Sequence, residues 1–156
     1  MKVCVFSDSH GYADNMIAAI GIEKPDLCFF LGDGERDLEE VAEAYPDLRI
    51  HAVRGNCDFF SMLNNTVVCS VGGVCILATH GHTYNVKYEH SFDSLTSAAV
   101  EAGADVALFG HSHRQHISRN RGVLLVNPGS AGGYGSPGYA VLTIENGNCS
   151  AELKKI

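Results

Sequence analysis

The sequence has few basic residues, no CxxC pair and no long hydrophobic run, and each absence excludes a class of protein. Its 11 Lys and Arg residues are scattered, and the formal net charge is -7. Sequence-independent binding of a nucleic acid backbone needs a clustered basic surface, so we do not expect it. The N-terminal MKVCVFSDSHG fits neither a secretory signal nor a transmembrane span, which predicts a cytoplasmic protein that does not contact the membrane.

The chain also shows no linker, internal repeat or long polar tract. At 156 residues, it is most simply one domain spanning residues 1–156. Five of the six cysteines lie in apolar, strand-like runs and are expected to be buried as small hydrophobic residues without disulfides. Cys57, between Asn56 and Asp58, is the exception.

Short β-rich runs alternate with amphipathic helical segments through the first two thirds of the chain, which is typical of βαβ units. We expect strands at 2–6, 27–31, 49–53 and 105–109, helices at about 13–22, 35–45 and 91–102, and a hairpin of TVVCSV and VCILAT around Gly72-Gly73. Further hairpin-like strands (HISRN, VLLVN, YAVLTIE, CSAELKK) follow. The pattern predicts an α/β fold in which two mixed β-sheets pack as a sandwich with helices on the outer faces, a four-layer α-β-β-α arrangement.

Each of five expected strands is followed by a loop that carries a potential metal ligand beside a glycine. The loops after these strands read SDSHG, GDG, RGNCD, THGH and GHSH. Side chains at i and i+2 of an extended chain point to the same side, so His111 and His113 are expected to face one small volume, as are Asp8 and His10. Asp33 stands alone between two glycines and is the natural bridging carboxylate.

These loops together supply enough donors for two metal ions. The seven donors are Asp8, His10, Asp33, Asn56, His80, His111 and His113. Two divalent cations and two carboxylates leave the site about +2, which would attract a phosphate into an acidic protein. Nitrogen and oxygen donors without thiolate suit two divalent transition-metal ions: Mn, Fe, Ni, Co or Zn, with Mn favoured.

The ordered motifs resemble those of the calcineurin-like metallophosphoesterases. Asp8-x-His10, Gly32-Asp33, Gly55-Asn56, His80-Gly81-His82 and GHSH, with NPGS further on, are similar to the small single-domain phosphodiesterase branch of that superfamily. The resemblance implies a double β-sandwich and a division of the ligands. Asp8, His10, Asp33 and His113 would hold one metal, and Asp33, Asn56, His80 and His111 the other.

The resemblance also implies hydrolysis of a small phosphate ester, with a phosphodiester favoured, by in-line attack of a metal-bridging hydroxide. Where the wider superfamily has a histidine that protonates the leaving group, this chain has Cys57, so Asp58, His82 or water is left for that step. Asn56, Cys57 and Arg54 are candidate substrate contacts. Residues 131–138 lack the Pro-Arg pair of small relatives, and they are expected to form a turn that could face the substrate.

Two other functions share the same motifs. A phosphomonoesterase acting on nucleotides or proteins would use the same metal centre. A protein-binding scaffold, as in the retromer subunit of similar fold, would have no need of His10, His111 and His113 together. His51, His90 and His116 are expected to be ordinary histidines outside the metal pair. Homo-oligomerisation is left open by the sequence.

Overall fold

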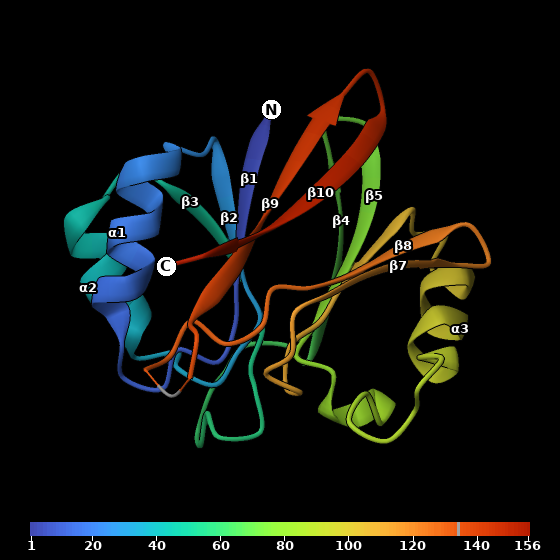
Figure 1. Ribbon diagram of the computed structural model, residues 1–156, viewed down its shortest axis with the longest axis horizontal. Helices are drawn as coiled ribbons and strands as arrows, with labels where there is room; N and C mark the ends of the chain where they lie inside the picture. The colour runs from blue at the N-terminus through green and yellow to red at the C-terminus, as the bar shows by residue number, and fades with distance from the viewer. Residues whose placement is uncertain (134) are drawn as a thin grey trace.

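Two mixed β-sheets form the centre of the protein, and helices cover their outer faces (Figure 1). The computed structural model describes residues 1–133 and 135–156. In order along the chain the elements are β1 (Lys2–Phe6), α1 (Ala13–Glu23), β2 (Leu27–Phe30), α2 (Asp37–Ala44), β3 (Arg49–Ala52), β4 (Thr66–Val71), β5 (Val74–Thr79), the 3₁₀ turn η1 (His82–Tyr84), α3 (Asp93–Glu101), β6 (Val106–Leu108), β7 (His116–Asn120), β8 (Val123–Asn127), β9 (Gly138–Glu145) and β10 (Asn148–Lys155).

The first sheet has the strand order β10-β9-β1-β2-β3, and the second has the order β4-β5-β6-β8-β7. β1, β2 and β3 pair in parallel in the first sheet, as do β5, β6 and β8 in the second, and antiparallel pairs complete both sheets. The hairpin around Gly72-Gly73 has the bounds expected from the sequence, whereas the three helices and several strands differ from expectation by one or two residues at an end. The mixed-sheet α/β sandwich is therefore confirmed.

Successive side chains of a strand point to opposite faces of its sheet, and this alternation divides the core into layers. Val3 and Val5 of β1 point into the cluster between the two sheets, while Cys4 and Phe6 point toward α1 and α2. A third cluster packs α3 against the second sheet through residues such as Leu95 and Phe109. Because the central strands are buried on both faces, they read as continuous apolar runs in the sequence.

The cysteines largely follow the sequence prediction. Cys4 and Cys28 are buried, Cys57 is exposed, and the remaining three are half-buried; all six are free thiols. No helix within residues 1–133 and 135–156 is both long and apolar enough to cross a membrane.

A buried carboxylate joins α1 to the far end of the first sheet. Glu23 ends α1, and its Oε1 accepts hydrogen bonds from Lys154 Nζ at 2.7 Å and Tyr139 Oη at 2.9 Å. Lys2 Nζ donates to Oε2 at 3.1 Å. These donors, Lys154 first, outweigh the cost of burial and lower the pKa of Glu23 to about 2.

This network predicts a pH-dependent contribution to stability. Because the pKa of Glu23 is lower when the chain is folded, its contribution is present above about pH 4.5 and is lost as the pH falls toward 2. Glu23→Gln should lower the free energy of unfolding at pH 7 by about 2 kcal/mol, and the difference should shrink below pH 4.5. Urea unfolding across this pH range measures it. The exposed Glu101→Gln is the control, and a pH-independent difference would contradict the role of the charge.

Candidate metal centre

The ends of the parallel strands meet along one edge of the sandwich and carry the polar loops (Figure 1). Asp8 N donates to Gly32 O at 2.9 Å, so the chain after β1 stays beside the chain after β2. Gly110 N donates to His80 O at 2.9 Å in the second sheet. The loops therefore lie where the backbone pairing of both sheets holds them.

Two glycines let these loops approach one another. A Cβ on Gly110 would lie 2.8 Å from Asp8 Oδ2 and would also collide with Ser7 Oγ. A Cβ on Gly55 would lie 2.7 Å from the carboxylate carbon of Asp33. The glycines of the GHSH and GNCD motifs are thus explained by the close approach of backbone to the two carboxylates.

The geometric reason expected for the paired motifs was wrong, because the loop residues are not extended. Positive φ angles between 47° and 65° occur at Asp8, His10, Asp33, His111 and His113. The left-handed conformation is uncommon for residues other than glycine and is concentrated at functional sites. It turns the chain sharply at each strand end.

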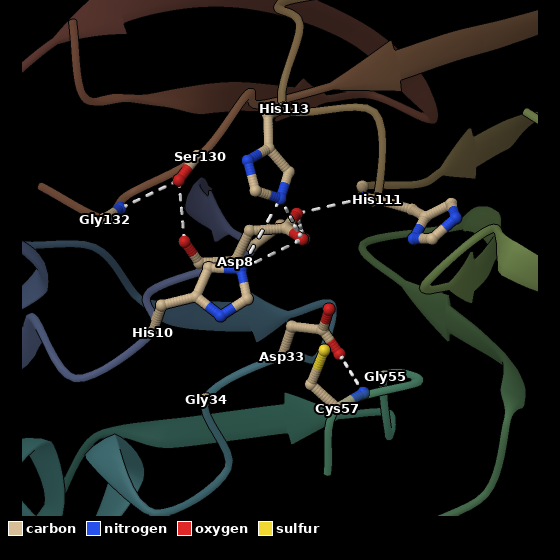
Figure 2. A network of polar contacts seen from close by, with 12 residues as sticks. Asp8, His10, Asp33, Gly34, Gly55, Cys57, His111, His113, Ser130 and Gly132 are labelled. Atoms are coloured by element: carbon tan, nitrogen blue, oxygen red, sulfur yellow. Dashed lines mark hydrogen bonds and ion pairs between the residues drawn. The ribbon is translucent and has the colours of Figure 1, made fainter. Parts of the chain in front are cut away.

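One group of donors consists of Asp8, His10 and His113, whose ligand atoms lie within 4.8 Å of one another. His113 Nε2 is 3.1 Å from Asp8 Oδ1, and the Nε2 atoms of His10 and His113 are 3.5 Å apart. Figure 2 shows both imidazoles directed toward the Asp8 carboxylate. Asp8 is fully buried, whereas His10 and His113 are exposed.

A second group lies beside the first and consists of Asp33, His80 and His111. His80 Nε2 is 3.3 Å from Asp33 Oδ2 and 3.1 Å from His111 Nδ1. Asn56 Oδ1 is also 3.1 Å from His80 Nε2. All seven donors expected from the sequence are thus brought to one place, and His111 and His113 belong to different groups.

The protonation of His80 shows that the second group fits a cation. His80 Nδ1 lies 2.7 Å from Leu31 O, and since a carbonyl oxygen only accepts, Nδ1 carries the proton. In the neutral ring, Nε2 then presents a lone pair to the oxygen atoms of Asp33 and Asn56. Acceptors facing acceptors repel one another unless a proton or a metal ion lies between them.

The first group fits a cation for a similar reason. Asp8 Oδ1 is buried and makes no hydrogen bond of acceptable geometry within the described residues, although His113 Nε2 is near. A buried carboxylate oxygen without a partner is costly in a protein interior. A divalent ion held by Asp8, His10 and His113 would remove this cost.

The electrostatics of the histidines also reflect this excess of acceptors. Burial acts to lower the pKa of His80, but the carboxylates of Asp33 and Asp8 outweigh it and raise that pKa. The pKa of His113 is raised chiefly by its contact with Asp8. By contrast, burial, together with the charges of His80 and Lys87, lowers the pKa of His111 to about 4. Lys87, which the sequence motifs did not indicate, contributes positive charge near both donor groups.

Asp8 is positioned by contacts that the sequence motifs did not predict. Ser7 Oγ donates to Asp8 Oδ2 at 2.5 Å, and the backbone N of His111 donates to the same oxygen at 3.0 Å. Ser130 Oγ donates to the backbone oxygen of Asp8 and accepts from Gly132 N (Figure 2), and Gly132 N also lies 3.1 Å from that backbone oxygen. The segment after β8 therefore holds the backbone of Asp8, and Tyr134 of the expected 131–138 turn lies outside the described residues.

Asp58 is committed to the backbone of the neighbouring loops. Its two carboxylate oxygens accept hydrogen bonds from the backbone N of Asp33, Gly34, Glu35 and Gly55 at 2.8–2.9 Å. Burial acts to raise the pKa of Asp58, but the four amides outweigh it and lower that pKa. A carboxylate held in its ionised form in this way is poorly suited to the expected role of an acid.

The other expected substrate contacts surround the second donor group. The His82 ring is 5.4 Å from that of His80 and 6.1 Å from that of His111, and its Nδ1 is buried without a partner. Arg54 is half-buried, and its Nε likewise has no partner within the described residues. Cys57 is exposed, and its backbone N donates to Asp33 Oδ1 at 2.7 Å. Burial first, then Asp33, raises the pKa of the Cys57 thiol to about 11.

Comparison with known proteins identifies the family of this constellation. Residues 1–147 match the model of the calcineurin-like phosphoesterase superfamily domain. The chain belongs to this superfamily. It is also 36% identical over 152 residues to "Probable metallophosphoesterase YsnB" of Bacillus subtilis, an alignment that covers 94% of this chain and 86% of that protein.

Solved structures of similar proteins agree with this assignment. A predicted phosphoesterase from Streptococcus pneumoniae superposes with a TM-score of 0.82 at 28% identity, covering 99% of this chain and 88% of that one. An archaeal phosphodiesterase superposes with a TM-score of 0.76 at 22% identity, covering 99% of this chain and all of that one. At 22% identity the archaeal likeness shows the fold alone.

Besides His82, three histidines of this phosphoesterase domain lie outside both donor groups. His116 Nε2 is 2.7 Å from Ser118 Oγ, and its ring packs against Phe92. His51 stacks on Phe29 with ring centroids 5.1 Å apart. His90 is exposed on the loop before α3.

The contacts of Asp58 lead to a test of its role. In Asp58→Asn, one amide oxygen replaces two carboxylate oxygens, and the new NH₂ group faces backbone donors. The free energy of unfolding of the metal-free protein should fall by about 2 kcal/mol in urea. Asp47→Asn, on an exposed site, is the matched control. Unchanged stability combined with lost turnover would instead make Asp58 the acid that the sequence suggested.

Proposed function

We propose that the protein hydrolyses phosphate esters at a dinuclear metal centre and prefers phosphodiesters. The observation that carries the proposal is the adjacency of two Asp/His donor groups whose lone pairs face one another. Membership of the calcineurin-like phosphoesterase superfamily supports the reaction class. The archaeal neighbour described as a phosphodiesterase is compatible with the preference for diesters.

Each donor group would hold one ion. Asp8, His10 and His113 would bind the first; His80, His111 and Asn56 would bind the second; and Asp33 would lie between them as the bridging carboxylate. When bound, two divalent ions would lower the pKa of a shared water for in-line attack and would neutralise the phosphate oxygens. Imidazole and carboxylate donors suit Mn, Fe, Co, Ni or Zn, and we take Mn as the first ion to test.

The protein side chains around the centre would orient the ester. Within the described residues, Arg54 and His82 each have a nitrogen without a hydrogen-bond partner, and a guanidinium or a protonated imidazole can bind phosphate oxygens through its other N–H groups. His82 is the better candidate for giving a proton to the leaving group, because Asp58 is occupied by four backbone amides. We assign Asp58 a positioning role: it holds the loops that carry Asp33 and Asn56.

One of the two alternatives explains less of the site. A phosphomonoesterase would use the same donors, and only substrate comparison separates it from a diesterase. A protein-binding scaffold would leave unexplained why two buried carboxylates and four imidazoles converge in two compact groups of possible ligand atoms.

Replacing the bridging carboxylate tests the proposal. The wild-type protein reconstituted with Mn should bind two equivalents, measured by elemental analysis, and should hydrolyse bis(p-nitrophenyl) phosphate. Asp33→Asn should bind no more than one equivalent and lose at least about a hundredfold in kcat/KM, because the amide has one neutral oxygen to share.

Asp14→Asn, an exposed carboxylate on α1, controls for the change of charge. Undiminished turnover by Asp33→Asn would refute bridging. Less than one bound equivalent and no hydrolysis by the wild-type protein would refute the enzyme itself.

A further inference from the structure

A cleft of about 970 Å³ opens beside the proposed metal centre and is lined by residues of α2 and of the loop that joins β3 to β4. His10, Asp33 and Cys57 line its inner end, so it is continuous with the proposed metal site. Its volume is in the range of pockets that hold small organic ligands. A group attached to a phosphate at the metals could therefore extend into the cleft.

Exposed aromatic rings line the outer part of this cleft. Phe59 is 78% exposed and Phe60 is 100% exposed, although burying a phenylalanine side chain is worth roughly 2 kcal/mol. Phe60 has a φ of 68°, an unusual conformation for a bulky residue. The remaining apolar lining comes from Leu38, Ala42, Ala52 and Leu63.

The loop that carries the rings is anchored to the metal centre. Phe59 N donates to Cys57 O at 3.0 Å, and Ser61 N donates to Asp58 O at 3.3 Å. Asp58 in turn binds the backbone of the loop after β2, including Asp33. The backbone of Phe59 and Phe60 is therefore anchored relative to the proposed metal ligands, and their rings line the cleft beside those ligands.

The charges in the cleft disfavour an anionic ligand. Two lining carboxylates already have partners, since Asp37 accepts from Ser9 Oγ and Gly11 N, and Asp58 accepts from four backbone amides. The remaining charged side chains away from the metals are Glu35, Arg36 and Glu39, which sum to -1. An uncharged group fits this environment better than a further phosphate oxygen or a carboxylate.

We propose that the cleft binds the planar, uncharged aromatic ester group that a phosphodiester substrate retains after hydrolysis, with Phe59 and Phe60 packing against it. This inference rests on the proposed function. A diester differs from a monoester by carrying a second organic group where the monoester has another oxygen anion. The cleft supplies an apolar place for that group beside the metals, and stacking on aromatic side chains would hold it.

Two substrates with the same leaving group test the assignment. Bis(p-nitrophenyl) phosphate and methyl p-nitrophenyl phosphate both release p-nitrophenolate, but they retain an aryl and a methyl group, respectively. The double variant Phe59→Ala/Phe60→Ala should lose about tenfold in kcat/KM for the first and less than about twofold for the second. Met62→Ala is the matched control, since Met62 is 96% exposed on the same loop and is absent from the cleft lining.

Binding to the metal-free wild-type protein gives a readout independent of turnover. Phenol, an uncharged aromatic probe, should shift the aromatic NMR signals of Phe59 and Phe60 and leave the methyl signal of Met62 in place. Methanol at the same concentration should shift neither ring.

Several outcomes would overturn the proposal. Equal losses for the two substrates would show that the rings do not recognise the retained group, and unchanged kinetics would show that they do not recognise the substrate. A change in sedimentation of the double variant without a change in the substrate ratio would instead place a second copy of the chain on the rings. Failure of the proposed function is distinguishable, because the wild-type protein would then hydrolyse neither substrate.

Discussion

The rest of the site depends on two of the hydrogen bonds that join the sheets at the edge where the candidate metal centre lies. His80, at the end of β5 in the second sheet, donates from Nδ1 to Leu31 O beyond β2 in the first. The backbone N of His111, beyond β6, donates to the carboxylate of Asp8, beyond β1. Each bond sets the position of a proposed ligand relative to the opposite sheet. The candidate metal centre is therefore formed by residues that follow strands of both sheets, and neither sheet could form it alone.

The same bonds also arrange the candidate donors so that a cation would fit between them. The proton on His80 Nδ1 is used by Leu31, so Nε2 faces the other donors with a lone pair. Left-handed backbone at five of the proposed ligands, including Asp8 and Asp33, adds local strain. Strain and facing lone pairs persist in a folded protein when the surrounding structure enforces them, and binding of metal can offset part of that cost. In this protein the two packed sheets beneath the loops hold the loop backbone in its left-handed conformation.

Much of this site could be predicted because the relevant signals are local in the sequence. A buried strand, a glycine and a His or Asp follow one another within a few residues at Asp8, Asp33, His80 and His111. Other parts could not be predicted, because they depend on partners far along the chain. Ser130 binds the backbone of Asp8 across 122 residues, and no local pattern marks that pair. The sequence suggested Asp58 as an available acid. Its four backbone partners come mainly from another loop, so the residues next to Asp58 in the sequence do not reveal them.

The sequence by itself determined the layered α/β sandwich and the set of donor residues, because alternating apolar strands and glycine-flanked polar turns are written in neighbouring positions. The family resemblance implied how the donors divide into two groups, but the physical cause of that division lies in the tertiary structure, which brings particular strand ends together. Only the tertiary structure decided that left-handed turns, and not extended chain, direct His111 and His113 to different groups. The cleft with Phe59 and Phe60 likewise exists only where α2 packs beside the anchored loop, because its walls come from separate parts of the chain.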